Sequence, residues 1–129
     1  MKTLKIFFAL VVAVLLFGQC TYDFIVPEEI VVIDPDDPNA EQISFSTQII
    51  PIFSAKCTSC HTTGKQMPDL SAANAFSSIN SSRYINSSSA ANSKIYTRPN
   101  PANTDSHPKY SEAEAALVLA WIQQGAKNN

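Results

Sequence analysis

The chain has 129 residues, enough for one small domain and a targeting segment but not for two full-sized domains. A domain of under about 100 residues buries a limited core and often needs a disulfide, a metal or a large cofactor to stabilise it. The net charge is −2, and no run of basic residues is dense enough to suggest a nucleic-acid partner.

The N-terminus has the pattern of an export signal. Lys2 and Lys5 precede an unbroken apolar run over residues 6–17. This run is shorter than the roughly 20 residues of a membrane span and is typical of a secretory signal peptide. Cys20 follows closely, as in bacterial lipoprotein signals, where such a cysteine becomes the lipid-bearing first residue. The sequence thus predicts a signal peptide over 1–19, lipidation of Cys20, and export to the periplasmic or cell-surface side. The alternative is an ordinary signal peptide with an incidental cysteine.

Residues 20–41 are expected to form a tether between the lipid and a globular head. The stretch 21–41 contains seven acidic side chains, three prolines and no Lys or Arg. Like charges and prolines both favour an extended, solvated chain. The remaining residues, 42–129, contain seven bases and four acids and are predicted to form the single folded domain.

The first part of this domain has two apolar helical stretches. Residues 49–56 could bury one helical face, but Pro51 lacks the N–H that a helix interior needs. The helix therefore starts near Ile50 or bends there. From Leu70 to Ile79 an apolar residue recurs every three positions, which predicts a short helix that starts at Ser71. The Ser- and Asn-rich stretch 77–93 is predicted to be loop.

The second part contains the clearest helix. Residues 97–108 hold three prolines and are predicted to be irregular. Ser111 and Glu114 then form a Ser-x-x-Glu capping box, an apolar face follows, and Gly125 is placed to end the helix. The domain shows no alternating strand pattern, so the expected fold class is all-α.

The chemistry is expected at Cys57-Thr58-Ser59-Cys60-His61, a C-x-x-C-H motif. Two thiols at this spacing can attach a haem covalently, and the next imidazole binds its iron. We therefore expect one haem c on Cys57 and Cys60, with His61 as proximal ligand. A thioredoxin-like pair would need a βαβ setting that is not evident. A disulfide, or a zinc site that also uses His107, stays open.

The residues around this motif carry a family resemblance. Ile-Pro-Ile-Phe at 50–53 precedes it, and Trp-Ile-Gln-Gln-Gly-Ala at 121–126 lies in the final helix. These features resemble small mono-haem cytochrome c lipoproteins and cytochrome c domains over most of 45–129. The resemblance implies a class I-like fold in which the first and last helices cross and pack beside a covalently bound haem. Trp121 would then lie at that crossing, with Phe53 as its expected neighbour.

The sixth iron ligand has two candidate side chains. Met67 lies only six residues after His61, so a connecting chain of at most about 20 Å would have to wrap tautly around the porphyrin. His107 lies 46 residues away and has no such restraint. The resemblance also places this ligand shortly before the last helix. We therefore expect His107 as the distal ligand, with Met67 or an open site as alternatives.

The expected function is electron transfer rather than enzyme catalysis, because no catalytic pair stands at a recognisable spacing. The expected partners are unidentified redox proteins, and the membrane through the lipid. A weakly positive docking face is possible, and a merely solvated surface is its alternative. Two other functions stay open: a haem enzyme or gas sensor with an open sixth site, and a binding module in which haem or zinc is only a structural staple. The basic side chains that could form the weakly positive docking face are Lys56, Lys65, Arg83, Lys94, Arg98 and Lys109.

Overall fold

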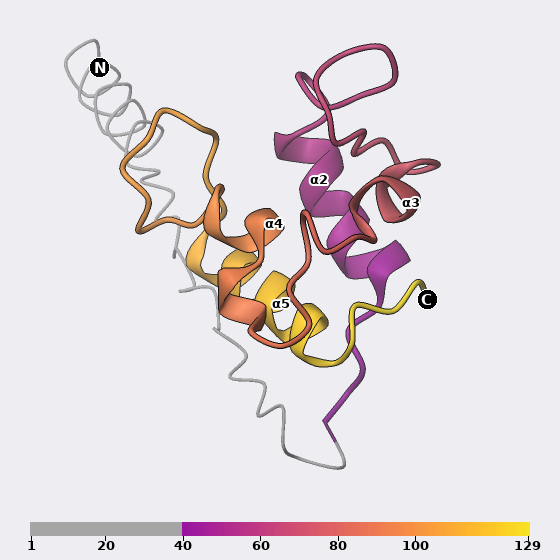
Figure 1. Cartoon of the computed structure of the whole chain (residues 1–129), viewed down its shortest axis with the longest axis vertical. Coiled ribbons are helices and arrows are strands. Elements are labelled where there is room, and N and C mark those ends of the chain that lie inside the picture. The colour runs from indigo at the N-terminus through magenta and orange to yellow at the C-terminus, as the bar shows by residue number, and fades with distance from the viewer. Residues whose placement is uncertain (1–39) are drawn as a thin grey trace, which may run out of the picture.

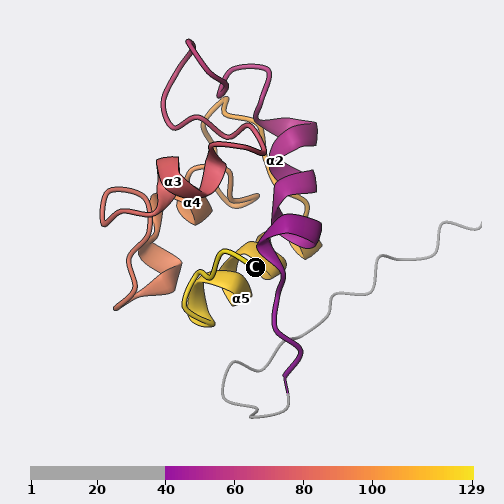
Figure 2. The same ribbon diagram turned by 90° about the vertical axis from the view of Figure 1, so that its right-hand side faces the viewer.

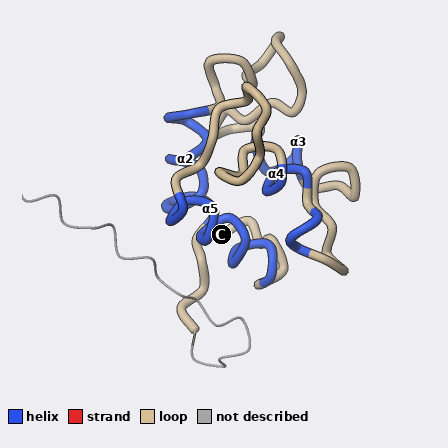
Figure 3. The backbone as a smooth tube through the Cα atoms, turned by 90° about the vertical axis from the view of Figure 1, so that its left-hand side faces the viewer, coloured by secondary structure: helices blue, strands red, loops and turns tan. Residues whose placement is uncertain are grey.

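A computed structural model describes residues 40–129 of the chain. The predicted signal peptide, Cys20 and the tether up to residue 39 lie outside the described residues. The described part contains helices and loops and no strand, so the all-α prediction is confirmed (Figures 1 and 3). Within it, no helix has both the length and the apolar character that a membrane crossing requires.

The domain begins with two helical segments that form one continuous rod, the π-helix η1 (Phe45–Ile49) and the α-helix α2 (Ile50–Lys56). Ser44 caps the rod, because its hydroxyl accepts a hydrogen bond from Thr47 N at 3.3 Å. Pro51 stands in the first turn of α2, where a missing N–H costs least. The wider π turn lies directly before it, which confirms the predicted change of geometry near Ile50.

The next helix, α3 (Ala75–Ile79), starts four residues later than predicted. Ser71 is not its N-cap, because the Ser71 hydroxyl donates to the Asp69 carboxylate at 2.7 Å. Residues 71–74 form a turn, and Asn74 precedes the helix.

The predicted loop over 77–93 is also only partly right. α3 extends to Ile79, and a 3-10 turn, η2 (Ala90–Asn92), follows, after which α4 (Lys94–Thr97) begins. Ser93, at 1 % exposure, anchors this segment, because its hydroxyl accepts a hydrogen bond from Asn86 N at 2.9 Å.

The last helix, α5 (Glu112–Gln123), starts and ends as predicted. Ser111 Oγ accepts from Glu114 N at 3.2 Å, and the Glu114 carboxylate accepts from Ser111 N at 2.6 Å, which completes the capping box. Gly125 follows the helix with φ +95°, a backbone conformation that other residues rarely adopt.

An aromatic cluster joins the first and last helical segments. Phe45 of η1 lies against Trp121 of α5, with ring centroids 5.0 Å apart, and also contacts Phe53 and Phe76 at 6.3 and 5.4 Å. The ring found against Trp121 is therefore Phe45, one helical segment earlier than the expected Phe53. Each such aromatic pair contributes about 0.5–1.5 kcal/mol beyond its burial.

Hydrogen bonds join the two chain ends of the domain at the same place. Asn129 accepts from Ser46 N through its main-chain oxygen and from Phe45 N through its side chain, both at 2.9 Å. The C-terminus thus lies beside the start of the rod, as Figure 2 shows. Both chain ends of the domain are held here. The other end of α2, at Lys56, leads into the loops that carry the candidate site (Figure 1).

Candidate functional site

The C-x-x-C-H motif forms the turn that ends α2. Cys57 N donates to Phe53 O at 2.8 Å, and His61 N donates to Cys57 O at 2.8 Å. The two thiols are free, with Cys57 buried and Cys60 exposed, so the disulfide alternative is not what the structure contains. Burial raises the pKa of Cys57 to about 11, and the nearby Glu114 charge adds to this effect while Lys56 opposes it.

The imidazole of His61 is oriented by the loop that follows it. Its Nδ1 atom lies 3.1 Å from the carbonyl oxygen of Pro68 and 3.2 Å from that of Gln66. A carbonyl oxygen only accepts, so Nδ1 carries the proton and Nε2 keeps its lone pair. Leu70 N donates to His61 O at 2.8 Å and closes the loop. This arrangement fixes the tautomer that a metal ligand needs.

A buried carboxylate holds this loop together. Asp69 accepts from Thr63 Oγ1 at 2.7 Å, from Asn74 Nδ2 at 2.9 Å, and from both the N–H and the hydroxyl of Ser71. These bonds, that from the Ser71 hydroxyl above all, hold the pKa of Asp69 well below its usual value. Sequence reasoning missed Asp69, although Asp two positions before Ser is a common turn pattern.

His107 faces His61 from the other side of the site. The two ring centroids lie 6.0 Å apart at an interplanar angle of 46°. His107 Nδ1 lies 3.0 Å from the carbonyl oxygen of Pro108, so its Nε2 is also left with a free lone pair. The structure therefore brings together two histidines that are 46 residues apart. Met67, the other candidate, is 62 % exposed.

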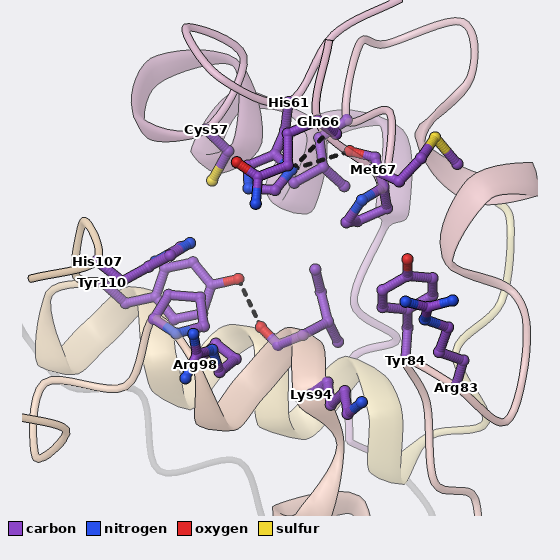
Figure 4. A pocket seen from close by; sticks show the side chains of 14 residues that line it. Cys57, His61, Gln66, Met67, Arg83, Tyr84, Lys94, Arg98, His107 and Tyr110 are labelled. Carbon is purple, nitrogen blue, oxygen red and sulfur yellow. Dashed lines mark hydrogen bonds between the residues drawn. The ribbon is translucent and has the colours of Figure 1, made fainter. Parts of the chain in front are cut away.

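A cavity of about 410 Å³ separates the two walls of the site (Figure 4). A second cavity of about 300 Å³ adjoins it and shares Cys57, His61 and His107 with it, and Cys60 lines only the second. Cofactor sites commonly have volumes of about 300–1,000 Å³. Both motif cysteines and both histidines thus line one hollow region of cofactor size.

Cationic side chains line part of the larger cavity. These are Arg83, Lys94 and Arg98, and no carboxylate of residues 40–129 lines that cavity with them. In Figure 4 Arg83 and Lys94 lie across the cavity from Cys57, and Arg83 lies next to the Tyr84 ring. The Arg83 guanidinium carbon is 5.6 Å from the centroid of the Tyr84 ring. Arg98 lies 3.2 Å from the Asp105 carboxylate, whereas Arg83 and Lys94 make no ion pair among residues 40–129 and would complement a ligand that carries negative charge.

The zinc alternative finds no support in this arrangement. A structural zinc ion needs four ligands. In the part of the chain that the structure describes, no three side chains of His, Cys, Asp or Glu converge closely enough to hold a metal ion.

Comparison with known proteins decides the family. The family model for cytochrome c matches residues 51–126, which include the whole C-x-x-C-H turn, the cavity wall and α5. The chain belongs to the cytochrome c family. The comparisons with curated proteins and with solved structures found no match.

Membership of the cytochrome c family explains the fold and the cavity. Its members carry a covalently bound c-type haem and transfer electrons to and from redox partner proteins, and they are typically carriers rather than enzymes. The chain's own residues fit such a haem. The two thiols of the motif border the hollow region, and so do the two imidazoles, whose Nδ1 atoms lie against backbone carbonyl oxygens and whose Nε2 atoms make no hydrogen bond among residues 40–129. The cations opposite Cys57 match the carboxylates that a haem carries on the edge away from its vinyl groups.

Proposed function

We propose that this cytochrome c is a single-haem, membrane-tethered electron carrier with two histidine iron ligands. The haem would be attached to Cys57 and Cys60, with His61 as the proximal ligand and His107 as the distal one. The observation that carries the assignment of the two ligands is the 6.0 Å separation of the His61 and His107 ring centroids.

That separation can be compared with the one that a shared metal ion requires. A metal–imidazole bond of about 2.0–2.1 Å, plus about 1.1 Å from the nitrogen to the ring centre, gives about 6 Å between two opposed ring centroids. The separation of His61 and His107 agrees with this value. An open sixth site, as in a haem enzyme or gas sensor, would not need a second imidazole at this distance.

The chain's residues would set the properties of the carrier. When bound, the haem iron supplies a one-electron couple between Fe(III) and Fe(II). The bonds from Nδ1 of each histidine to a backbone carbonyl fix both rings, so little rearrangement accompanies a change of charge. Two histidine ligands give a lower reduction potential than a histidine and a methionine. Arg83 and Lys94 would meet the haem carboxylates.

Visible spectroscopy of the matured protein tests the ligand assignment. We expect sharp reduced α and β bands in the parent, conversion to a high-spin spectrum in His107→Ala, and an unchanged spectrum in Met67→Ala. Spectral loss in Met67→Ala alone would transfer the sixth position to methionine. A high-spin parent that binds carbon monoxide rapidly would favour the enzyme or sensor instead.

The tether is proposed from the sequence pattern alone. A signal peptide over 1–19, a lipid on Cys20 and the acidic segment to residue 41 would hold the carrier on the periplasmic or cell-surface side of a membrane. Partner proteins would then approach a head that is restrained near the membrane. Cys20→Ala should release the haem protein from the membrane fraction, and retention of this variant in that fraction would refute the lipid anchor.

A further inference from the structure

His107 lies in a loop that has no helix or strand of its own. The loop runs from Pro99 to Tyr110, and its two ends are joined because Tyr110 N donates to Pro99 O at 2.8 Å. An irregular loop can present an imidazole in many positions. Something other than secondary structure must therefore hold His107 at 6.0 Å from His61.

Side-chain oxygens shape this loop through a succession of turns. In each turn, an Asn or Asp side chain accepts a hydrogen bond from the backbone N–H two residues further along, as is typical of Asx turns. The three bonds run from Ala102 N to Asn100 Oδ1 at 2.9 Å, from Asp105 N to Asn103 Oδ1 at 3.1 Å, and from His107 N to Asp105 Oδ1 at 3.1 Å. The last of them ends on the candidate ligand itself.

Asp105 differs from the two asparagines because it also pairs with a cation on each side of the loop. Its Oδ1 accepts from Lys109 Nζ, and its Oδ2 lies 3.2 Å from Arg98 Nη1. The Oδ2 atom is buried and has no partner in hydrogen-bond geometry among the described residues, so the Arg98 charge is its compensation. One carboxylate thus connects the entry of the loop, the exit of the loop and the backbone of His107.

The exit of the loop is in turn fixed to the helix that carries the cysteines. Lys56, the last residue of α2, donates to Lys109 O at 3.2 Å and also to the Glu114 carboxylate at 2.5 Å. Glu114 belongs to the capping box of α5. These polar bonds therefore link the segment that carries Cys57 to the loop that carries His107. Within this network, Asp105 is the side chain that bonds directly to His107.

We propose that Asp105 is the positioning residue for the distal ligand: its carboxylate holds the loop in the shape that keeps His107 opposite His61. Without it, His107 would leave the site more often and a small neutral ligand could take its place. This inference rests on the proposed function in one respect, namely that His107 binds the iron.

The test uses the full matured haem protein and two exogenous ligands, carbon monoxide and imidazole. In Asp105→Ala we expect at least a tenfold faster uptake of carbon monoxide by the reduced protein and a tenfold higher affinity of the oxidised protein for imidazole. A tenfold change corresponds to about 1.4 kcal/mol. Asp105→Asn keeps an oxygen for His107 N but loses the charge that pairs with Lys109 and Arg98, so its ligand uptake should fall between those of the parent and Asp105→Ala.

A matched control is Glu112→Ala, which removes an exposed carboxylate five residues after His107 that makes no hydrogen bond or ion pair among residues 40–129. It should behave like the parent. Circular dichroism at the assay temperature should show the same helical content for all variants, since a merely unfolded variant would lose it. Parent-like ligand uptake in Asp105→Ala would overturn the inference, and so would equal effects of Asp105→Ala and Glu112→Ala.

Failure of the inference and failure of the proposed ligand set are distinguishable through His107→Ala. If His107→Ala becomes high-spin while Asp105→Ala stays parent-like, the ligand assignment stands and the role of Asp105 is refuted. If His107→Ala keeps the parent spectrum, His107 is not the ligand and the proposed function fails first.

Discussion

The hydroxyl of Tyr110 should contribute at least about 1 kcal/mol to the free energy of unfolding of the domain. It donates to the carbonyl oxygen of Ile95 at 2.9 Å, and Tyr110 is only 3 % exposed. Ile95 belongs to α4, and the residue four positions later, Pro99, has no N–H to offer its carbonyl. Burial raises the pKa of Tyr110 well above its usual value, so the phenol remains a donor over the accessible pH range.

Tyr110→Phe therefore leaves a buried acceptor without a partner. Such a group costs about 1–3 kcal/mol, and in a domain of this size each kcal/mol lowers the melting temperature by about 4–8 °C. Thermal unfolding followed by circular dichroism should show a decrease of at least about 4 °C. Tyr96→Phe is the matched control, because Tyr96 is partly buried and its hydroxyl has no hydrogen-bond partner within residues 40–129, and we expect a change below about 0.5 kcal/mol. Equal melting temperatures for Tyr110→Phe and the parent would refute the reasoning.

Three further variants test the packing, the charge pair and the helix end. Trp121→Ala removes a side chain that is 1 % exposed and lies against Phe45, and urea unfolding should show a loss of about 3–5 kcal/mol, whereas a loss below about 1 kcal/mol would contradict the central role of the aromatic cluster. Burial opposes the ionisation of Glu114, but its bonds to Lys56 and Ser111 outweigh this effect and lower its pKa. The stability that this ionisation provides is complete above the unfolded pKa and is lost as the pH falls through the lower folded pKa. Glu114→Gln should therefore be less stable than the parent at pH 7 and converge with it in acid, and a constant difference between pH 7 and pH 3 would contradict this pH dependence. Gly125→Ala meets no atom within 4 Å but must keep φ +95°, so it should cost about 1–2 kcal/mol in thermal unfolding through backbone strain alone, and an unchanged melting temperature would show that the helix end can relax.

Features with local causes could be predicted from the sequence. The last helix carries its own start and stop signals in Ser111, Glu114 and Gly125, and it lies where they indicate. The C-x-x-C-H motif is equally local, and it lies at the end of an apolar helix as expected. The change of helical geometry next to Pro51 follows from the chemistry of a single residue.

Features that depend on distant partners could not be predicted. Ser71 looks like a helix cap, but its hydroxyl donates to Asp69 instead, and α3 begins later. α4 could not be predicted because its N-cap residue, Ser93, makes no side-chain capping bond. The Ser93 hydroxyl accepts from Asn86 N instead. Phe45 is the neighbour of Trp121 because η1 and α5 meet in space, which no sequence spacing reveals.

The features of the candidate site also fall into those with local causes and those that depend on distant partners. His61 could be assigned from the motif, whereas the orientation of its ring depends on the carbonyl of Pro68 and on the bonds that Asp69 makes. His107 could be named as a candidate from its position before the last helix. Its approach to His61 depends on the Asx turns and on the ion pairs of Asp105, whose partners are set by the folded loop.

A redox titration of the matured protein, followed in the reduced α band, tests the central claim most directly. A single-haem electron carrier predicts one fully reversible wave, with a slope of about 59 mV per tenfold change in the ratio of oxidised to reduced protein, and low-spin spectra at both ends. The absence of a reversible wave would contradict electron transfer and leave the haem a structural group, and two separate waves would contradict a single haem.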